Sequence, residues 1–190
     1  MKTVLPDIDA VIISDYAKGF LTDRLLTLLI GEAKALGKTV IVDPKGRDFS
    51  KYKGANIVTP NKREAADACG FDVHSDGIVE NSGRKLISDL DLDALLITEG
   101  EHGMTLFERS GQRSHLDALA HNVYDVTGAG DTVIATFTAA IASGACFLES
   151  ARLATAAAGL VVQNVGTTQI TREMLVEFFS SHENVRSIQA

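Results

Sequence analysis

The sequence contains few cysteines and no recognisable leader. Only Cys69 and Cys146 occur among 190 residues, and they lack the short spacing of metal ligands. This excludes a disulfide-rich secreted scaffold and a cysteine-based zinc site, and favours free thiols in a reducing compartment. The first residues also lack the basic, apolar and small-residue regions of a signal peptide. We therefore expect a cytoplasmic protein.

An excess of basic residues and a long hydrophobic run are also absent. The 18 Lys and Arg face 25 Asp and Glu, giving a net charge of −7, which argues against a nucleic-acid surface. The longest uncharged stretch, Thr132–Leu148, is interrupted by Ser143 and Gly144, which predicts a buried helix and a turn rather than a membrane span. A small anionic substrate is still compatible with this net charge, because binding it needs only a local basic pocket.

Apolar runs alternate with helical periodicity in the first half of the chain. Strands are expected at Ala10–Ser14, Thr39–Val42, Asn56–Val58 and Ala94–Thr98, and helices at Thr22–Leu36, about Lys62–Cys69 and near Ser82–Leu90. This alternation predicts a parallel sheet covered by helices on both faces.

The second half begins with an antiparallel pattern and then becomes helical. The runs Met104–Glu108 and Arg113–Asp117 predict a hairpin, and helices are expected at about Asp131–Ser143, Phe147–Asn164 and Thr171–Ser180. The sequence has no internal repeat, low-complexity tract or interdomain linker. We therefore expect residues 1–190 to form one α/β domain.

Residues with reactive or binding side chains, and turn glycines, follow successive strands. These pairs are Asp15 and Lys18, Asp43 and Lys45, Asn61 and Glu64, and Gly100 and Gly103. Ligands of parallel sheets collect beyond the carboxyl ends of the strands, so the order of these residues predicts a shared cleft at one sheet edge.

A run of small residues precedes the first helix of the second half. Gly128, Ala129 and Gly130 allow successive N–H groups to face an anion at the start of that helix. Asp131 beside them suits the general base of a phosphoryl transfer. The structural alternative is a tight turn with Asp131 as the helix cap. A Walker loop is absent from the sequence, and Val133 replaces the third glycine of a dinucleotide fingerprint.

The stretch Asp-Val-Thr-Gly-Ala-Gly-Asp at 125–131 resembles the carboxy-terminal signature of the ribokinase-like (PfkB) carbohydrate kinases, from which only Val126 departs. The resemblance implies a three-layer αβα ribokinase-like fold, mostly parallel, with an added antiparallel hairpin. It covers only the carboxy-terminal part of the family's domain, so the amino-terminal sugar-recognition part is expected to be missing. Asp131 would be the catalytic base, with Gly128, Ala129 and Gly130 as the anion hole.

The same resemblance implies an ATP site with Mg²⁺ and a monovalent cation such as K⁺. Asn61-Lys62-Arg63-Glu64 matches the family's Asn-x-x-Glu motif, in which Glu64 helps to hold hydrated Mg²⁺; a capping box is the structural alternative. Nucleotide contacts are implied for Thr98, Gly100 and Gly103, and for Thr155 where the family commonly has Asn beside adenine. Asp125 and the Thr127 carbonyl match the positions that hold the monovalent cation.

The substrate is suggested by two lysine loops. Ser-Asp-Tyr-Ala-Lys-Gly at 14–19 and Asp-Pro-Lys-Gly at 43–46 look like the heptose-7-phosphate kinase branch of this family. Asp15, Lys18, Asp43 and Lys45 would then contact the sugar phosphate or the transferring phosphoryl group. This implies formation of heptose 1,7-bisphosphate in ADP-heptose (lipopolysaccharide core) synthesis.

Two alternatives remain open at this point. One is a ribokinase-like kinase for another sugar, and the other is a nucleotide-binding module that is inactive by itself because its sugar site is absent. An incomplete sheet would expose an apolar edge, which would favour a homodimer.

Overall fold

One six-stranded sheet organises the computed structural model, which describes residues 4–120, 124–164, 166 and 168–186. The strands lie in chain order, and the first three pairings are parallel whereas the last two are antiparallel. Their bounds are β1 Ala10–Ser14, β2 Thr39–Asp43, β3 Ile57–Val58, β4 Ala94–Thr98, β5 Met104–Glu108 and β6 Arg113–Leu116. The predicted parallel sheet with an added hairpin is confirmed.

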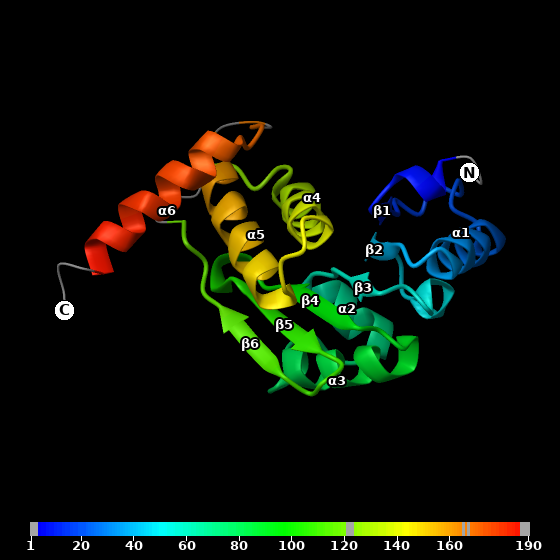
Figure 1. The fold of residues 1–190 in the computed structure, drawn as a ribbon. Helices are drawn as coiled ribbons and strands as arrows, with labels where there is room; N and C mark the ends of the chain where they lie inside the picture. The colour runs from blue at the N-terminus through cyan, green and yellow to red at the C-terminus, as the bar shows by residue number, and fades with distance from the viewer. Residues whose placement is uncertain (1–3, 121–123, 165, 167, 187–190) are drawn as a thin grey trace.

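Helices cover both faces of this sheet (Figure 1). The face with α1, α2 and α3 lies opposite the face with α4 and α5, and α6 lies beside α5. The helices are α1 Asp23–Ala35, α2 Lys62–Cys69, α3 Ile78–Leu90, α4 Ala129–Ala142, α5 Phe147–Val161 and α6 Arg172–Arg186, and the short 3₁₀ helices are η1 Leu5–Asp7, η2 Ser50–Tyr52 and η3 Gly100–His102. The architecture is the predicted three-layer αβα arrangement.

Alternation along the strands explains the two separate cores. In β2, Val40 and Val42 pack with the core under α1, α2 and α3, whereas Ile41 packs with the core under α4 and α5. Successive side chains of a strand point to opposite faces, so a continuous apolar strand serves both helical layers. The central strands are therefore buried on both sides, and the polar residues beyond their ends are left at the sheet edge.

Helix boundaries differ from the prediction mainly at α3. This helix begins at Ile78, four residues before the expected Ser82, after Gly77 adopts a left-handed φ of 66°. Ile78 is buried, so its tertiary contacts favour an earlier start than the surrounding polar residues indicate. At the other end of the chain, α6 continues to Arg186 beyond the expected Ser180.

The uncharged stretch Thr132–Leu148 forms most of α4 and the beginning of α5. A turn at Ser143 and Gly144, with φ of 91° at the glycine, separates the two helices as expected. Throughout the part of the chain that the structure describes, no helix combines the length and apolar character that a membrane span requires.

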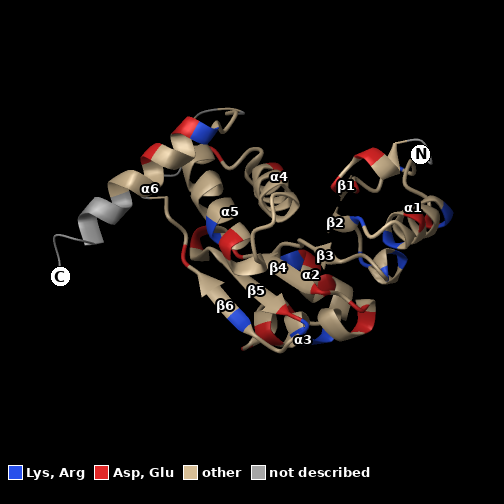
Figure 2. Cartoon of the chain, in the orientation of Figure 1, with Lys and Arg blue, Asp and Glu red and all other residues tan. Residues whose placement is uncertain are grey.

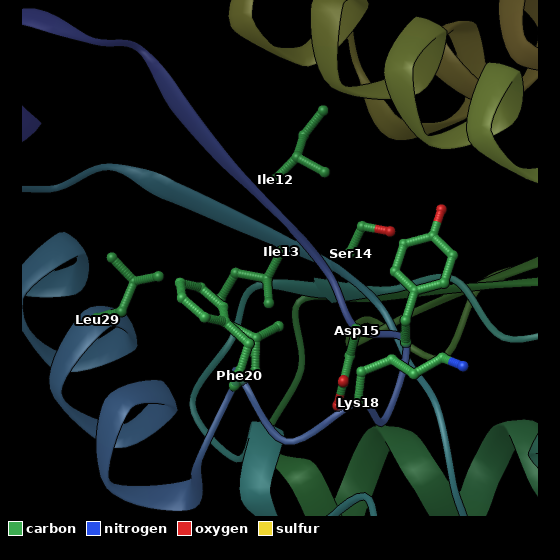
Figure 3. A pocket seen from close by; sticks show the side chains of 9 residues that line it. Ile12, Ile13, Ser14, Asp15, Lys18, Phe20 and Leu29 are labelled. Carbon is green, nitrogen blue, oxygen red and sulfur yellow. The ribbon is translucent and has the colours of Figure 1, made fainter.

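Strand β1 forms one edge of the sheet. Among the described residues it pairs only with β2, and a hollow of about 440 Å³ lies beside it. Figure 3 shows Ile12 and Ile13 on opposite sides of this strand, with Phe20 and Leu29 nearby. Phe20 is 81% exposed and Ile12 is 44% exposed, so the lateral edge of the sheet formed by β1 presents apolar surface.

Candidate active site

The loops that follow the parallel strands lie side by side at one sheet edge. Ser14 and Asp43 are paired at the ends of β1 and β2, and the Asp15 N–H donates to the Asp43 carbonyl at 3.0 Å. Asn61 forms a parallel bridge with Thr98 at the ends of the next two strands. Asp15 therefore neighbours Asp43, and Asn61 neighbours Thr98, at the carboxyl ends of the strands. Asp15 and Lys18 line one hollow whereas Gly100 and Gly103 line another, so a single cleft shared by all these residues stays a prediction.

The start of α2 combines a helix cap with an ion pair. Asn61 Oδ1 accepts the Glu64 N–H at 2.9 Å, and Glu64 Oε2 accepts the Asn61 N–H at 3.0 Å. The second carboxylate oxygen, Oε1, lies 2.7 Å from the Lys45 ammonium. The capping alternative is thus present, yet it leaves Oε1 for a cation, while Lys62 and Arg63 complete the first turn.

The pKa of Asp43 indicates that the carboxylates of Asp43, Glu64 and Asp131 lie near one another. Burial, together with the charges of Glu64 and Asp131, raises the pKa of Asp43 to about 6, although Lys45 opposes the shift. Glu64 stands on α2 and Asp131 on α4, so helices from opposite faces of the sheet meet near the end of β2. The resulting negative field suits a cation that would accompany a phosphate-bearing ligand.

The start of α4 presents backbone N–H groups without a side-chain cap. Gly128 is the cap residue, with φ of 79°, and Asp131 is the third residue of the helix. The Ala129 N–H donates to the Val126 carbonyl at 3.2 Å, but within the described residues Gly130 and Asp131 donate to no backbone carbonyl. Asp131 is exposed and does not cap α4, so the capping interpretation of this residue is wrong. In Figure 2 the rest of α4 is uncharged.

Asp125 is fixed just before this helix. Its Oδ1 accepts the Thr127 N–H at 2.9 Å and its Oδ2 accepts the Gly166 N–H at 3.1 Å. Hydrogen bonds from Thr127, and then from Gly166, hold the pKa of Asp125 below its ordinary value. A carboxylate kept ionised in this way is chemically suited to hold a monovalent cation.

A hollow of about 470 Å³ lies between the β4–β5 turn and helices α4 and α5. Thr155 lies in its wall, and its hydroxyl donates to the Ala151 carbonyl at 2.8 Å. Apolar side chains and backbone make up most of the lining, which includes Thr98, Gly100, Gly103, Met104, Leu119, Val126, Ala129, Gly130, Val133, Thr155, Ala158, Gly159 and Val162. A mostly apolar lining with a few polar groups is typical of small-molecule pockets.

Gly103 is required because the end of β6 comes very close to the β4–β5 turn. Its φ is 88°, and a Cβ there would stand 2.0 Å from the Leu116 carbonyl oxygen. Gly100 has φ of 63° but open space around a Cβ. The β4–β5 turn therefore packs tightly against the backbone of Leu116 on one side and faces the hollow on the other.

The Asp15 carboxylate, just after the end of β1, is held by hydrogen bonds from other side chains. Its Oδ2 accepts hydrogen bonds of 2.6 Å from both Lys51 Nζ and the Tyr52 hydroxyl. Lys18 lies three residues further along and is exposed, as Figure 3 shows near Asp15. The sequence analysis did not identify Lys51 or Tyr52, because 36 and 37 residues separate them from Asp15 and no local pattern links them.

Glu64 and its neighbours fit a loosely held divalent cation. Among the residues that the structure describes, no three His, Cys, Asp or Glu side chains are grouped to hold a metal. Mg²⁺ keeps several waters and commonly needs one or two carboxylates plus substrate phosphates. Glu64 Oε1, with Asp43 contributing charge, meets this requirement.

Curated relatives match most of the chain. It is 48% identical over 176 residues to the bifunctional protein HldE of Paramagnetospirillum magneticum, and 50% identical over 173 residues to HldE of Caulobacter sp.. These alignments include 93% and 90% of the chain. The chain spans about 36% of the length of each of these relatives.

Solved structures show the same fold at low identity. Arabidopsis thaliana ribokinase, complexed with ribose and ATP, superposes with a TM-score of 0.81 at 24% identity, over 93% of this chain and 57% of that one. Escherichia coli phosphofructokinase-2, in complex with potassium, gives a TM-score of 0.82 at 19% identity, over 95% and 60%. The six-stranded sheet and its two helical layers are thus a ribokinase-like fold.

The family model described as pfkB family carbohydrate kinase matches residues 4–174, which includes every element from η1 to the start of α6. The match includes the strand-end loops and the glycine turn before α4. With the ribokinase-like fold and the HldE relatives, it shows that this chain belongs to the pfkB family of carbohydrate kinases.

Proposed function

We propose that this chain provides the ATP site and the catalytic base of a sugar kinase that converts heptose 7-phosphate to the 1,7-bisphosphate. The observation that carries the proposal is the position of Asp131. It is exposed in the first turn of α4, directly after Ala129 and Gly130, which line an apolar hollow. Family membership and the likeness to sugar kinases support the reaction class.

Asp131 would act as general base. Its carboxylate takes the proton of the anomeric hydroxyl while that oxygen forms a bond to the γ-phosphorus of ATP. The bond between the γ-phosphorus and the oxygen that bridges to the β-phosphate breaks, and ADP leaves. The N–H groups of Gly130 and Asp131 point out of the N-terminal end of α4 without a competing carbonyl among the described residues, so they would stabilise the charge on the transferring group. The N–H of Ala129, also predicted for the anion hole, already donates to the Val126 carbonyl.

Other strand-end residues would position the reactants. Glu64 holds a hydrated Mg²⁺, which when bound neutralises phosphate charge, and Asp125 with the Thr127 carbonyl holds a monovalent cation such as K⁺. Thr98, Gly100, Gly103 and Thr155 form the walls for the nucleotide. Lys18 and Lys45 bind phosphate at the ends of β1 and β2.

The choice of heptose 7-phosphate rests on sequence motifs. The motifs Ser-Asp-Tyr-Ala-Lys-Gly at 14–19 and Asp-Pro-Lys-Gly at 43–46 resemble that branch of the family. The similarity to proteins named HldE supports the same choice. Other sugar phosphates are the competing substrates. A substrate with a distal phosphate suits two lysines at neighbouring strand ends.

A nucleotide-binding module without independent activity is the second candidate function. The open edge of β1 favours it, since Ile12 and Phe20 expose apolar surface beside Asp15 and Lys18. A kinase needs the acceptor held in line with ATP and shielded from water. The two candidate functions differ in turnover but not in nucleotide binding.

Calorimetry with ATP and Mg²⁺, followed by an assay of ADP release with and without heptose 7-phosphate, tests the proposal. Sugar-dependent release at about 1 s⁻¹ or faster, with a new anomeric phosphate visible by ³¹P NMR, supports the kinase. ATP binding without such release favours the module. Faster release with another sugar phosphate would overturn the substrate assignment, and absence of ATP binding would contradict both functions.

A further inference from the structure

A buried cluster connects the two lysine loops of the site. Tyr52 is fully buried, and Asp15 is 5% exposed. The Tyr52 hydroxyl donates to Asp15 Oδ2 at 2.6 Å and accepts the Lys45 N–H at 3.1 Å. One hydroxyl group thus joins the loop after β1 to the loop after β2, from the η2 helix beneath them.

Lys51 neutralises the carboxylate in this cluster. Its ammonium lies 2.6 Å from Asp15 Oδ2 and 4.9 Å from the centre of the Tyr52 ring. Burial acts to raise the pKa of Asp15, but hydrogen bonds from Lys51, Tyr52 and Ala17 outweigh this effect and hold the pKa below its ordinary value. Asp15 is therefore an ionised group with its own counter-ion, which leaves the positive charge of nearby Lys18 available to an external anion.

The loop after β1 is held in a strained conformation. Ala17 has φ of 52°, a left-handed value that alanine rarely adopts. Its N–H donates to Asp15 Oδ1 at 2.8 Å, so the same carboxylate that receives Lys51 and Tyr52 also fixes this residue. Strain of this kind persists where surrounding contacts impose it, and it concentrates at functional sites.

Stability alone does not account for such a cluster. A buried ion pair often contributes no more than apolar residues of similar volume would, since both charges lose their hydration. The cluster instead fixes the positions of two lysines relative to each other. Lys18 follows the strained Ala17 directly, and the backbone N–H of Lys45 donates to the Tyr52 hydroxyl.

We infer that Tyr52 and Lys51 are positioning residues that set the spacing of Lys18 and Lys45 for the phosphate group of the sugar substrate. This inference rests on the proposed function of those two lysines. Neither residue contacts the phosphate itself. Tyr52 couples the two loops. Lys51 pairs with Asp15, so that Asp15 does not compete with the phosphate for Lys18.

Two variants test the two parts of this role. Tyr52→Phe removes only the hydroxyl and keeps the buried ring, and Lys51→Met removes the charge, with Lys51→Arg as its charge-retaining counterpart. Ser150→Ala is the matched control, because the fully buried Ser150 hydroxyl donates to the Cys146 carbonyl at 2.9 Å in α5, outside this cluster.

Binding of heptose 7-phosphate and of ATP is measured by calorimetry for each variant. We expect Tyr52→Phe and Lys51→Met to weaken heptose 7-phosphate binding by about tenfold, because lysine loops that are no longer held in place would have to be ordered on binding, and ordering one long side chain costs about that much. ATP binding should change less than about twofold, and Lys51→Arg should restore most of the sugar-phosphate affinity. Equal losses for both ligands, or losses no larger than those of Ser150→Ala, would overturn the inference.

Amide hydrogen exchange separates this inference from the proposed function, because it needs no ligand. In Tyr52→Phe the amides of Ala17 and Lys45 should exchange faster than in the parent and in Ser150→Ala, while those of α5 should not. Unchanged exchange at both positions would overturn the coupling of the loops. Faster exchange in Tyr52→Phe, together with a parent protein that binds no sugar phosphate, would contradict the proposed substrate and leave the coupling of the loops established.

Discussion

The ammonium of Lys45 lies 2.7 Å from Oε1 of Glu64, the carboxylate oxygen that the helix cap leaves free. Oε2 of the same carboxylate is already occupied by the Asn61 N–H. In the proposed function a hydrated Mg²⁺ uses this free side of Glu64. Lys45 and the metal would therefore compete for one oxygen.

This competition predicts opposite shifts for Glu64→Gln and Lys45→Met. Each variant removes the same partly exposed ion pair, which contributes at most about 1 kcal/mol, so melting temperatures should change by no more than about 4 °C. In melting titrations with ATP, half-saturation by Mg²⁺ should move to higher concentration in Glu64→Gln and to lower concentration in Lys45→Met. Shifts in the same direction, or unshifted curves, would contradict the metal role.

Asp131→Asn should remove the base without disturbing the fold. Gly128 rather than Asp131 caps α4, so the melting temperature should stay close to that of the parent. Sugar-dependent ADP release should fall by about 10²- to 10⁴-fold, the usual loss for a general base. The same substitution in the first turn of α1, Asp23→Asn, is the control. Activity within about twofold of the parent would rule out Asp131 as base.

Gly103→Ala and Gly100→Ala should differ strongly in stability. Both place alanine at positive φ, which costs about 1 kcal/mol or more, but only at Gly103 would the Cβ meet a backbone oxygen, at 2.0 Å. We expect a total loss of about 3 kcal/mol for Gly103→Ala, together with weaker ATP binding, and about 1 kcal/mol for Gly100→Ala. Urea unfolding measures the difference, and equal losses would show that the turn can move away from β6.

The stability of Asp43→Asn relative to the parent should increase as pH rises, because the parent becomes less stable. The folded-state pKa of Asp43, about 6, lies above its ordinary 3.8, so the parent loses stability as pH rises through 6 while the Asn variant does not. A difference of about two pKa units corresponds to at most about 3 kcal/mol. Melting temperatures in metal-free buffer between pH 4.5 and 8 measure this, with Ser150→Ala as the pH-independent control. A constant difference across this range would contradict the shift.

Local sequence signals were sufficient for most of the fold. Short apolar runs identified β1, β2 and β4, and Asn61 and Gly70 marked the ends of α2, because apolar runs and helix caps depend on neighbouring residues. The start of α3 at Ile78 was missed, since burial of that side chain is a tertiary effect.

The sequence by itself determined which residues stand at the strand ends and at the glycine turn before α4, because parallel strands separated by helices bring their carboxyl ends to one edge. Only the tertiary structure decided how those residues are partnered. Asp15 meets Tyr52 across 37 residues, and Asp43 is influenced by Asp131 on a helix from the other face of the sheet. Such contacts depend on how separate layers pack, and burial changes the charge state of a carboxyl group in ways that no local pattern records.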